Sequence, residues 1–576
     1  MPKNNKDFYN RISDLLNRYR YEIYLIIFSI FALIIHIHLS STLNLGNDEA
    51  HYYVWSLKPS LGYLDDAPFV GWVIYVFDWI FGKSQLDVRL GVVVFSFLDG
   101  FLIYYFTYIM FKNKRSAFFA FLFFLSALIF GMVLSVMMLP DAPLLFFTLC
   151  FLIFFYKALE EKVSDLKSDT FFVPLFLWLL SGIFLGLAFL SKYTAALLPP
   201  AAFLYLLVSK RNRHYLKTFY PYMSLAIAIA VFSPVIYWNF THNFISFKFQ
   251  LSHGFSHPKP GFPLLAAGWL GQVLVLTPFI YIFLITTYIY SILKMIKGSD
   301  LKSDPFIEAF LFSACFSLPI LLFFIINGYS HRILVHWPDI GYLSAFPILG
   351  YFADFLTQKK SDTNKAWSGI VKYYLYFTIF SGLFLSFVLY NQIYYNSIPV
   401  GKIIRYIDKE KRLKKKGIFS VIPHIPGKPS TADITNDLFG WKHSAKYIGI
   451  VYKGYEAAYR PLFILTHHYA IADELVFYGG YKPGVNIYNI SGFLNQYDIW
   501  QKLSKINGEN ALFVMDNKYM IDPVKVYAPF FKSIREIGKL DIYVKFRPVR
   551  TYYLYLMKGF KAGMAIKRFG LTGRMY

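Results

Sequence analysis

Cysteine and charged residues are both scarce in this chain of 576 residues. Charged side chains make up 16% of it, against about one quarter in soluble globular proteins, which argues against a purely soluble enzyme. The two cysteines, Cys150 and Cys315, lie inside apolar runs and exclude a disulfide framework or a cysteine-rich zinc site. Hydrophobic residues make up 56% and aromatic residues 21%, which excludes a disordered or coiled-coil chain. The composition favours a polytopic membrane protein.

The net charge of +24 is unevenly spread along the chain. Residues 401–576 hold 29 Lys and Arg against 13 Asp and Glu, a net charge of +16. Such a balance can indicate nucleic-acid binding, but the sequence has no zinc finger, RNA-recognition signature or single basic stripe. Before residue 401 the basic residues form short clusters between apolar runs, as topology signals do. We therefore expect membrane lipids as partners, and no nucleic acid.

Apolar stretches of spanning length recur through residues 1–395 and predict a helical membrane domain. The segment 68–81 is apolar but too short to span and carries Asp78, so we interpret it as an interfacial helix. Eleven spans are predicted, at 21–41, 87–111, 116–137, 143–157, 172–190, 194–208, 218–238, 264–292, 306–326, 340–357 and 367–392.

Residues 396–576 have a different character, with glycine and proline punctuation and no stretch long enough to span. Short β-branched and aromatic runs predict strands between helices. We therefore expect a soluble mixed α/β domain, joined to the membrane domain by a basic linker at 409–416. The predicted strand segments are 447–452, 511–515, 542–546 and 551–557.

Lysine and arginine in alternate short loops predict the orientation, because such residues favour the cytoplasmic side. With eleven spans, the amino terminus is then in the cytoplasm and the carboxy-terminal domain is outside. The basic character of that domain does not oppose this topology, since long domains are translocated largely regardless of charge. The basic segments that set the orientation are 3–20, 112–115, 210–213, 294–302 and 359–365.

Acidic residues gather in the first loop that is expected to face outward. Asp48 and Glu49 are followed by Asp65 and Asp66, all among aromatic and apolar residues. Such neighbours raise the pKa of a carboxyl group, which suits a general base or a divalent-cation ligand. The alternative for any acidic loop is a solvated segment that binds no metal.

Three further outward loops carry candidate site residues. Asp141 stands between two prolines, either as a reactive acid or as a helix cap. Lys192, beside Tyr193, lies on the outer side against the topological bias, where it can bind a phosphate group or extend toward the interface. Arg332 and His336 place a cation and an imidazole at the mouth of an aromatic span.

The ordered set of motifs resembles the glycosyltransferase family 39 group of membrane enzymes, which includes protein O-mannosyltransferases and bacterial transferases that attach aminoarabinose to lipid A. The similarity covers nearly the whole chain. Its motifs are NDEAHYYVWS at 47–56, GYLDDAPFVGW at 62–72, MLPDAPLLFF at 138–147, GLAFLSKYTAALLP at 186–199, SPVIYWNFTHNFISFKFQ at 233–250, HWPDIGYL at 336–343, DITNDLFGWK at 433–442 and NQYDIW at 495–500.

The resemblance implies a GT-C fold and a polyprenyl-phosphate-sugar-dependent, usually inverting glycosyltransferase. Asp48 matches the acid proposed as general base or acceptor-positioning group, while Lys192 and His336 match positions near the lipid phosphate. In relatives, the loop at Asp65 and Asp66 supplies an acid followed by a basic residue and two prolines. Asp66 replaces that basic residue here, and a divalent metal ion bridging carboxylates and phosphate would be one way to compensate.

The function expected from these residues is sugar transfer at the outer face of a bacterial inner membrane. The cationic outer domain favours an anionic glycolipid acceptor such as lipid A or a lipopolysaccharide core. A protein acceptor is the alternative. A transporter or flippase is the competitor from another class, but it would place ionisable residues within its spans, often in repeated broken helices.

Overall fold

The computed structural model describes residues 13–161, 172–255, 261–296, 305–358, 365–395, 397–398, 400, 434–544 and 547–569. The predicted linker at 409–416 lies outside these ranges, as do residues 1–12, 297–304 and 359–364 of the basic segments.

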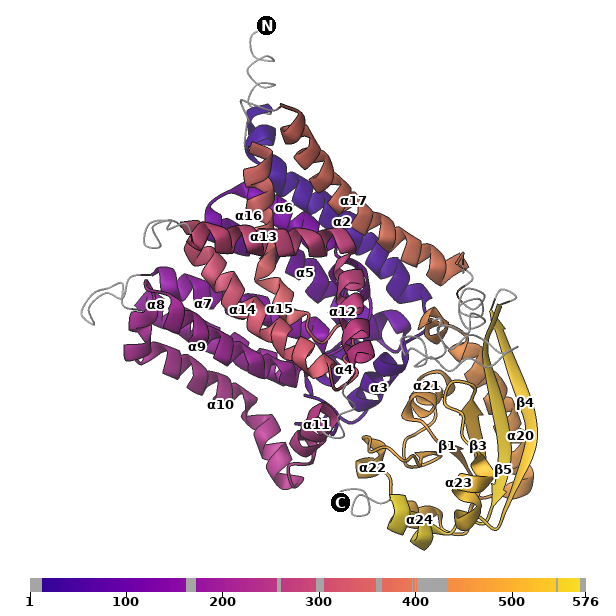
Figure 1. Cartoon of the computed structure of the whole chain (residues 1–576). Coiled ribbons are helices and arrows are strands. Elements are labelled where there is room, and N and C mark those ends of the chain that lie inside the picture. The colour runs from indigo at the N-terminus through magenta and orange to yellow at the C-terminus, as the bar shows by residue number, and fades with distance from the viewer. Residues whose placement is uncertain are drawn as a thin grey trace, which may run out of the picture.

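The described part of the first 395 residues forms a helical bundle, and α2 and α17, at one edge of it in Figure 1, contact each other near their carboxy-terminal ends. Its helices are α2 (Arg20–Thr42), α3 (Asn47–Ser56), α4 (Phe69–Phe81), α5 (Gln85–Phe111), α6 (Lys114–Ser126), α7 (Asp141–Glu160), α8 (Phe172–Ser191), α9 (Leu198–Val208), α10 (Tyr220–Thr241), α11 (Ile245–Phe255), α12 (Phe262–Leu276), α13 (Pro278–Ile296), α14 (Pro305–Gly328), α15 (Ile340–Leu343), α16 (Ala345–Gln358) and α17 (Lys365–Tyr395).

Eight helical segments in the described part of the chain are long and apolar enough to cross a membrane. This number confirms a multi-pass helical protein. The other three predicted spans, 87–111, 116–137 and 194–208, are helical over all or part of their length, in α5, α6 and α9. The eight segments are α2, α7, α8, α10, α13, α14, α15 with α16, and α17.

Besides 340–357, which is divided into α15 and α16, and 194–208, which begins with a 3₁₀ turn at Tyr193–Leu197, two of the predicted spans are interrupted. Within 116–137, α6 ends at Ser126 and a π-helical turn follows at Ile129–Val133. Gly131 in that turn approaches the carbonyl oxygen of Leu125 so closely that a Cβ would lie 1.9 Å from it. The stretch 264–292 breaks at Thr277, whose φ is +74°, between α12 and α13. The next residue, Pro278, explains this break because a residue before proline disfavours the helical conformation.

The segment expected to be an interfacial helix is helical, as α4. It buries Val70, Gly71 and Ile74 against the bundle and leaves Trp79 and Phe81 exposed. An exposed aromatic face on a short apolar helix is typical of segments at a membrane surface, and the interfacial location stays a prediction.

The carboxy-terminal domain contains a five-stranded sheet in the order β2-β1-β3-β5-β4. β1 is parallel to β2 and β3, whereas β5 is antiparallel to β3 and β4. This confirms the mixed α/β prediction. The elements are α20 (Trp441–Tyr459), β1 (Leu462–Thr466), α21 (Tyr469–Gly479), β2 (Ile487–Asn489), α22 (Tyr497–Trp500), β3 (Asn510–Asp516), α23 (Pro523–Tyr527), β4 (Ser533–Val544), β5 (Arg547–Lys558) and α24 (Ala562–Phe569).

The strands predicted at 511–515 and 551–557 fall in β3 and β5, and 542–544 of the segment 542–546 falls in β4, with 545–546 outside the described residues. The prediction of a strand at 447–452 is wrong. This segment belongs to helix α20. Ile448 and Tyr452 of this segment belong to a buried face with helical spacing that includes Trp441 and Ala445, whereas Tyr447 and Ile450 are exposed. The short run resembled a strand because the window was too narrow to show a period of 3.6 residues.

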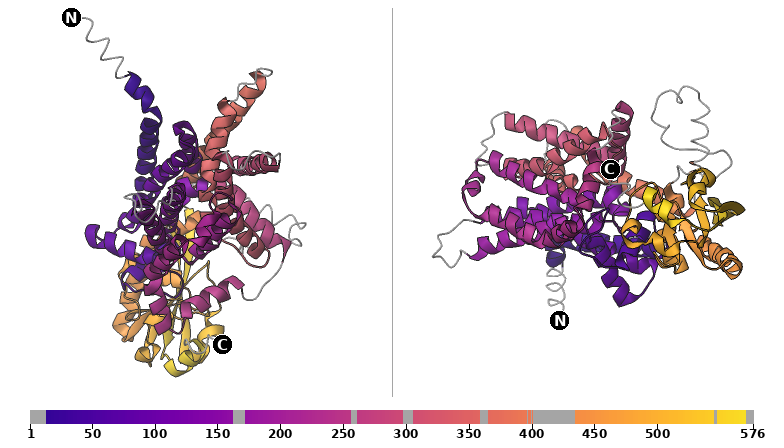
Figure 2. Two further views of the ribbon diagram at one scale, coloured as in Figure 1. Left: turned by 90° about the vertical axis from the view of Figure 1, so that its left-hand side faces the viewer. Right: turned by 90° about the horizontal axis from the view of Figure 1, so that it is seen from below.

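The carboxy-terminal domain packs against the start of the membrane domain. Helix α21 lies on α3, and one buried apolar cluster contains Val54 and Trp55 from α3 together with Ile471 and Leu475 from α21. The first turns of α2 lie at the opposite end of the bundle from this domain (Figures 1 and 2). The first loop is therefore enclosed between the bundle and the carboxy-terminal domain.

Candidate active site

A buried lysine is the centre of the candidate site. Lys192 directly follows α8, and its Nζ donates a hydrogen bond of 2.6 Å to Oδ1 of Asp141, the first residue of α7. The lysine side chain is only 9% exposed, so it does not extend toward an interface. The Asp141 carboxylate is engaged in this ion pair rather than in a helix cap. Two residues predicted in separate loops are thus direct partners.

Two further carboxyl groups share this environment. Burial and the charge of Asp141 raise the pKa of Asp339 well above its ordinary value, and protonated Asp339 can donate to Asp141. Burial also raises the pKa of Asp66 to about 7, although Lys192 opposes the shift. Burial disfavours the charge of Lys192 itself, but the three carboxyl groups outweigh it and hold the lysine pKa above its ordinary value. Lys192 is therefore a cation at neutral pH.

His336 is adjacent to this cluster but does not add a second cation. Its Nε2 lies 3.9 Å from Oδ2 of Asp141. Burial lowers the histidine pKa to about 4, with the charge of Lys192 contributing in the same direction. The imidazole is neutral at neutral pH and can serve as a hydrogen-bonding group beside the ion pair.

Tyr52 connects the Lys192 cluster with Asp48. The phenol of Tyr52, on α3, is surrounded by the charges of Asp48, Asp66 and Asp141, and together with burial these raise its pKa well above the ordinary value. Asp48 itself is exposed and has no hydrogen bond among the described residues. The protein around Asp48 still desolvates its carboxyl group enough to raise the pKa. A carboxylate that is accessible and has a raised pKa suits a general base.

Asp65 belongs to a different set of contacts from Asp66. Its Oδ2 lies 2.7 Å from Nε2 of His51, and the other ring nitrogen of His51 lies 2.7 Å from Oδ2 of Asp473 in the carboxy-terminal domain. Burial disfavours the charged imidazole, but the two carboxylates outweigh burial and raise the His51 pKa to about 10. His51 therefore links the two domains, and the indole N–H of Trp55 also points at its Nε2, at 3.2 Å.

Glu49 points away from Asp48, into the protein. Its two carboxylate oxygens accept from the guanidinium of Arg89 at 2.6 and 2.7 Å, and both side chains are fully buried. The backbone N–H groups of Gly46 and Met138 donate to the same carboxylate. The remaining donors of Arg89 reach the carbonyl oxygens of Ser40, Leu43 and Asn44. These contacts join α3 to α2 and α5, and the catalytic role expected for Glu49 stays a prediction.

Replacing Glu49 by glutamine is expected to destabilise the protein by about 3–5 kcal/mol, because Arg89 would remain buried without a counter-charge. Thermal unfolding in detergent would measure the loss. The matched control is E160Q, which breaks a pair between exposed Glu160 and Arg211 and is expected to change stability by less than about 1 kcal/mol. Wild-type stability together with lost activity would instead give Glu49 a direct chemical role.

The structure brings Tyr193 into the site but not Arg332. The hydroxyl of Tyr193 lies 2.9 Å from Oγ of Ser246, and its backbone N–H donates to Asp66. Arg332 is exposed and forms no hydrogen bond or ion pair with any residue that the structure describes. Its predicted role in phosphate binding remains a prediction.

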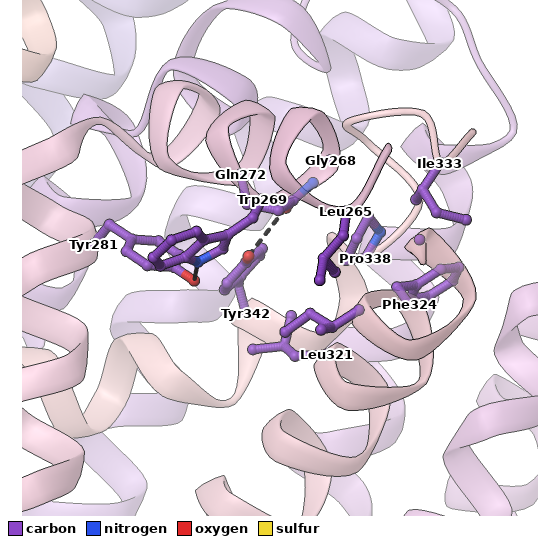
Figure 3. A pocket seen from close by; sticks show the side chains of 12 residues that line it. Leu265, Gly268, Trp269, Gln272, Tyr281, Leu321, Phe324, Ile333, Pro338 and Tyr342 are labelled. Atoms are coloured by element: carbon purple, nitrogen blue, oxygen red, sulfur yellow. Dashed lines mark hydrogen bonds between the residues drawn. The ribbon is translucent and has the colours of Figure 1, made fainter. Parts of the chain in front are cut away.

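An apolar groove opens beside the loop that carries His336. Leu265, Gly268 and Trp269 of α12 form one wall, and Leu321 and Phe324 of α14 form another (Figure 3). Ile333 and Pro338, on either side of His336 in the chain, also line it. Two hydrogen bonds connect lining residues of the groove: Tyr342 donates to Gln272, and Trp269 donates to Tyr281.

Over the described ranges, no three His, Cys, Asp or Glu side chains are grouped in a way that could hold a metal ion. The carboxyl groups of Asp141, Asp339 and Asp66 surround Lys192, whose ammonium group already supplies a positive charge there. These residues do not fit the bridging metal considered for the Asp66 position.

Comparisons with known proteins agree with this architecture. The family described as dolichyl-phosphate-mannose-protein mannosyltransferase matches residues 65–238. The undecaprenyl phosphate-alpha-4-amino-4-deoxy-L-arabinose arabinosyl transferase 1 of Proteus mirabilis (strain HI4320) is 28% identical over 192 residues, 32% of each chain. The aligned region thus spans about a third of that relative.

Two crystal structures of ArnT from Cupriavidus metallidurans extend the likeness to the whole fold. The apo structure has a TM-score of 0.56 at 15% identity and covers 92% of this chain and 97% of its own. The structure bound to undecaprenyl phosphate has a TM-score of 0.55 at 14% identity, with 92% and 98% covered. The chain has the GT-C fold. The resemblance predicted from the ordered motifs is confirmed.

Several residues of this GT-C site were not predicted as site residues. Asp339 and His51 stand within the quoted motifs HWPDIGYL and NDEAHYYVWS, and His51 showed no signal of its own. A second acid three residues after His336 was the one available sign for Asp339. Asp473 could not be found from sequence, because nothing local shows that α21 docks on α3.

Proposed function

We propose that the protein is an integral-membrane glycosyltransferase that moves a sugar from a polyprenyl-phosphate carrier to an acceptor at the outer face of the bacterial inner membrane. The observation that carries this proposal is the buried Lys192 cation, placed at helix ends beside an apolar groove. The named activity of the Proteus mirabilis relative, an undecaprenyl phosphate-linked arabinosyl transferase, supports the same donor class.

The proposed reaction breaks the bond between the anomeric carbon and the phosphate oxygen of the carrier. The acceptor oxygen attacks the anomeric carbon from the opposite face, which inverts its configuration, and polyprenyl phosphate leaves with the bonding electron pair. Lys192 stabilises the charge that develops on that phosphate. A hydroxyl acceptor also loses a proton, which Asp48 takes up.

The groove between α12 and α14 suits the hydrocarbon chain of the carrier. Its lining is mainly aliphatic and aromatic, and it is formed by helices of the membrane domain. Ile333 and Pro338, which line the groove, stand on either side of His336 in the chain, and His336 lies beside Asp141. A carrier lying in the groove would therefore bring its phosphate toward the Lys192 cluster.

The transporter alternative receives less support from the geometry. Lys192 follows α8, Asp141 begins α7, and Asp66 and Asp339 lie in loops. An ion or substrate path through a transporter would place such groups near the middle of the spans.

The acceptor class is proposed from charge. The carboxy-terminal domain carries the larger share of the net positive charge, +16 of +24, and each basic residue near an anionic surface contributes about 1 kcal/mol of attraction. This favours an anionic glycolipid, such as lipid A or a lipopolysaccharide core. A protein acceptor is the second candidate, favoured by the description of the matching mannosyltransferase family.

Purified protein incubated with radiolabelled undecaprenyl-phosphate sugars and lipid A is expected to yield labelled glycolipid and free undecaprenyl phosphate. Parallel reactions with envelope proteins test the second acceptor class. Reactions of protein that has been treated with a chelator and repurified without metal test whether a metal ion is required. Uptake of the donor into vesicles without transfer to either acceptor would overturn the enzyme proposal. Label on protein alone would overturn the glycolipid choice.

The sidedness proposed is an amino terminus in the cytoplasm and a carboxy-terminal domain in the periplasm. Alkaline phosphatase fused after Tyr576 is expected to be active, whereas the same enzyme fused before residue 13 is expected to be inactive, because it folds only outside the cytoplasm. The opposite pattern would reverse the orientation and move the candidate site to the cytoplasmic face.

A further inference from the structure

The carboxy-terminal domain places a lysine next to Asp48. Lys518 lies two residues after β3, and the hydroxyl of its neighbour Tyr519 accepts a hydrogen bond of 3.2 Å from Nδ2 of Asn47. Because Asn47 directly precedes Asp48 in α3, this bond brings the two segments together. Burial raises the pKa of Asp48, and the charges of His51 and Lys518 oppose the rise. Lys518 is therefore close enough to act on the proposed general base.

Lys518 is held in place by contacts within its own domain. Its backbone N–H and that of Tyr519 both donate to Oδ1 of Asp516, at the end of β3. Its Nζ donates to Oδ2 of Asp437, which stands in the motif DITNDLFGWK, and lies 5.3 Å from the centre of the Tyr519 ring. The ring of His468 stacks on Tyr519 at a centroid distance of 3.5 Å. These contacts orient the ammonium group before any ligand arrives.

The ammonium group of Lys518 remains available to a ligand. The lysine side chain is 30% exposed, and an ammonium group has three N–H donors. Asp437 takes one donor and Tyr519 can take a second, which leaves one for a ligand. The other oxygen of Asp437 lies 3.6 Å from the guanidinium of Arg550, so this carboxylate shares its charge between two cations.

His51, the other group that opposes the pKa shift at Asp48, is not available in this way. Its side chain is only 5% exposed, and its ring nitrogens each lie 2.7 Å from a carboxylate oxygen, one of Asp65 and one of Asp473. Of these two groups beside Asp48, Lys518 is the one that a ligand can reach.

Asp48 lies between this lysine and the Lys192 cluster. The phenol of Tyr52 interacts with both Asp48 and Asp141, and Asp141 is the partner of Lys192. In the proposed reaction the donor phosphate occupies the Lys192 side, so the acceptor reaches Asp48 from another direction. An anionic acceptor is repelled by the Asp48 carboxylate unless a cation offsets that charge, and Lys518 supplies the cation.

We propose that Lys518 is an acceptor-binding residue: its ammonium group binds a phosphate group of the acceptor glycolipid and so places the acceptor next to Asp48. The inference rests on the proposed glycosyl transfer and deepens it. It gives the carboxy-terminal domain one specific contact with the acceptor, in addition to a general attraction to anionic lipids.

The direct test is the binding of lipid A to the full-length protein in detergent, measured beside lipid A from which the phosphate groups have been removed. The wild type should bind the phosphorylated form about tenfold more tightly, the effect expected of one charge-assisted hydrogen bond. K518M removes the charge and should abolish this preference, while Asp437 keeps Arg550 as its counter-charge. K518R keeps the charge and should retain most of the preference.

The matched control is K539M, which removes a lysine of β4 that pairs with Asp541 on the surface of the same domain. It should keep the wild-type preference for phosphorylated lipid A, which separates a specific contact from the general charge of the domain. A wild-type preference in K518M, or an equal loss of affinity for both forms of the lipid, would overturn the proposal.

Turnover supplies a second readout. K518M is expected to raise the KM for lipid A about tenfold, with an unchanged KM for the polyprenyl-phosphate donor and a kcat within about threefold of wild type at saturating lipid A. An active K518M with the wild-type KM for lipid A would overturn the inference and leave the proposed transfer intact. Loss of phosphate-dependent binding in K518M, in a protein that transfers sugar to no acceptor, would support the phosphate site and locate the failure in the proposed function.

Discussion

Replacing Lys192 by alanine is expected to lower kcat by about 100- to 1,000-fold, the usual effect of removing a group that stabilises developing negative charge. Lys192 is buried, charged and surrounded by carboxyl groups, so no solvent cation replaces it at the leaving phosphate. K192R should retain more activity than K192A because it keeps the charge, but the larger planar guanidinium cannot occupy the ammonium position next to Asp141. Single-turnover transfer with a labelled donor measures the chemical step directly.

The same substitution has a structural cost that must be separated from the chemical one. K192A leaves Asp141 buried without its partner, which is expected to cost about 3–5 kcal/mol of stability. The double variant D141N/K192M removes both charges and should recover stability without recovering turnover. K442A, which changes an exposed lysine of α20, serves as the control and should behave as the wild type. Turnover by K192A within about threefold of wild type would remove Lys192 from the mechanism.

The membrane-domain architecture could be predicted from sequence because the signal for a span is local. An apolar run of spanning length has few alternatives to a helix, and eight such helices confirm most of the predicted spans. The two failures, at 116–137 and 264–292, occur where apolar composition continues through a break in the backbone. At Gly131 and Thr277, packing and backbone geometry interrupt the helix without a change in hydropathy.

The site could be predicted only as a set of separate residues. The motifs pointed to Asp141 and Lys192, but a sequence does not show that residues 51 positions apart form an ion pair. Asp48 and Glu49 were both predicted as site residues because they lie in one acidic loop among aromatic and apolar neighbours. Successive residues on a helix point about 100° apart, so one faces the site and the other is buried against Arg89. Contacts made by Asp473 depend on domain docking, which leaves no pattern in the sequence.

Replacing Asp48 by asparagine is expected to lower kcat by about 100- to 10,000-fold if the acceptor is a hydroxyl group, the range typical of a lost general base. Asp48 must be deprotonated to act, and its pKa is raised by the protein that desolvates it. Wild-type kcat/KM should therefore increase as the pH rises through a value above the ordinary aspartate pKa. Asp66, whose pKa is raised to about 7, can produce a second limb in the same pH profile. The limb that disappears in D48N and persists in D66N belongs to Asp48.

The same variant distinguishes the two acceptor chemistries. A phosphate acceptor is already an anion near neutral pH and has no proton that must be removed before attack. With such an acceptor, D48N would raise the KM for the acceptor and leave kcat within about tenfold of wild type. A hydroxyl acceptor predicts the reverse, a large loss in kcat with little change in KM. Parallel assays of D48N with lipid A and with a dephosphorylated lipid A therefore report which oxygen attacks the anomeric carbon. Wild-type kcat and KM for D48N with every acceptor that the wild type uses would exclude Asp48 from both roles.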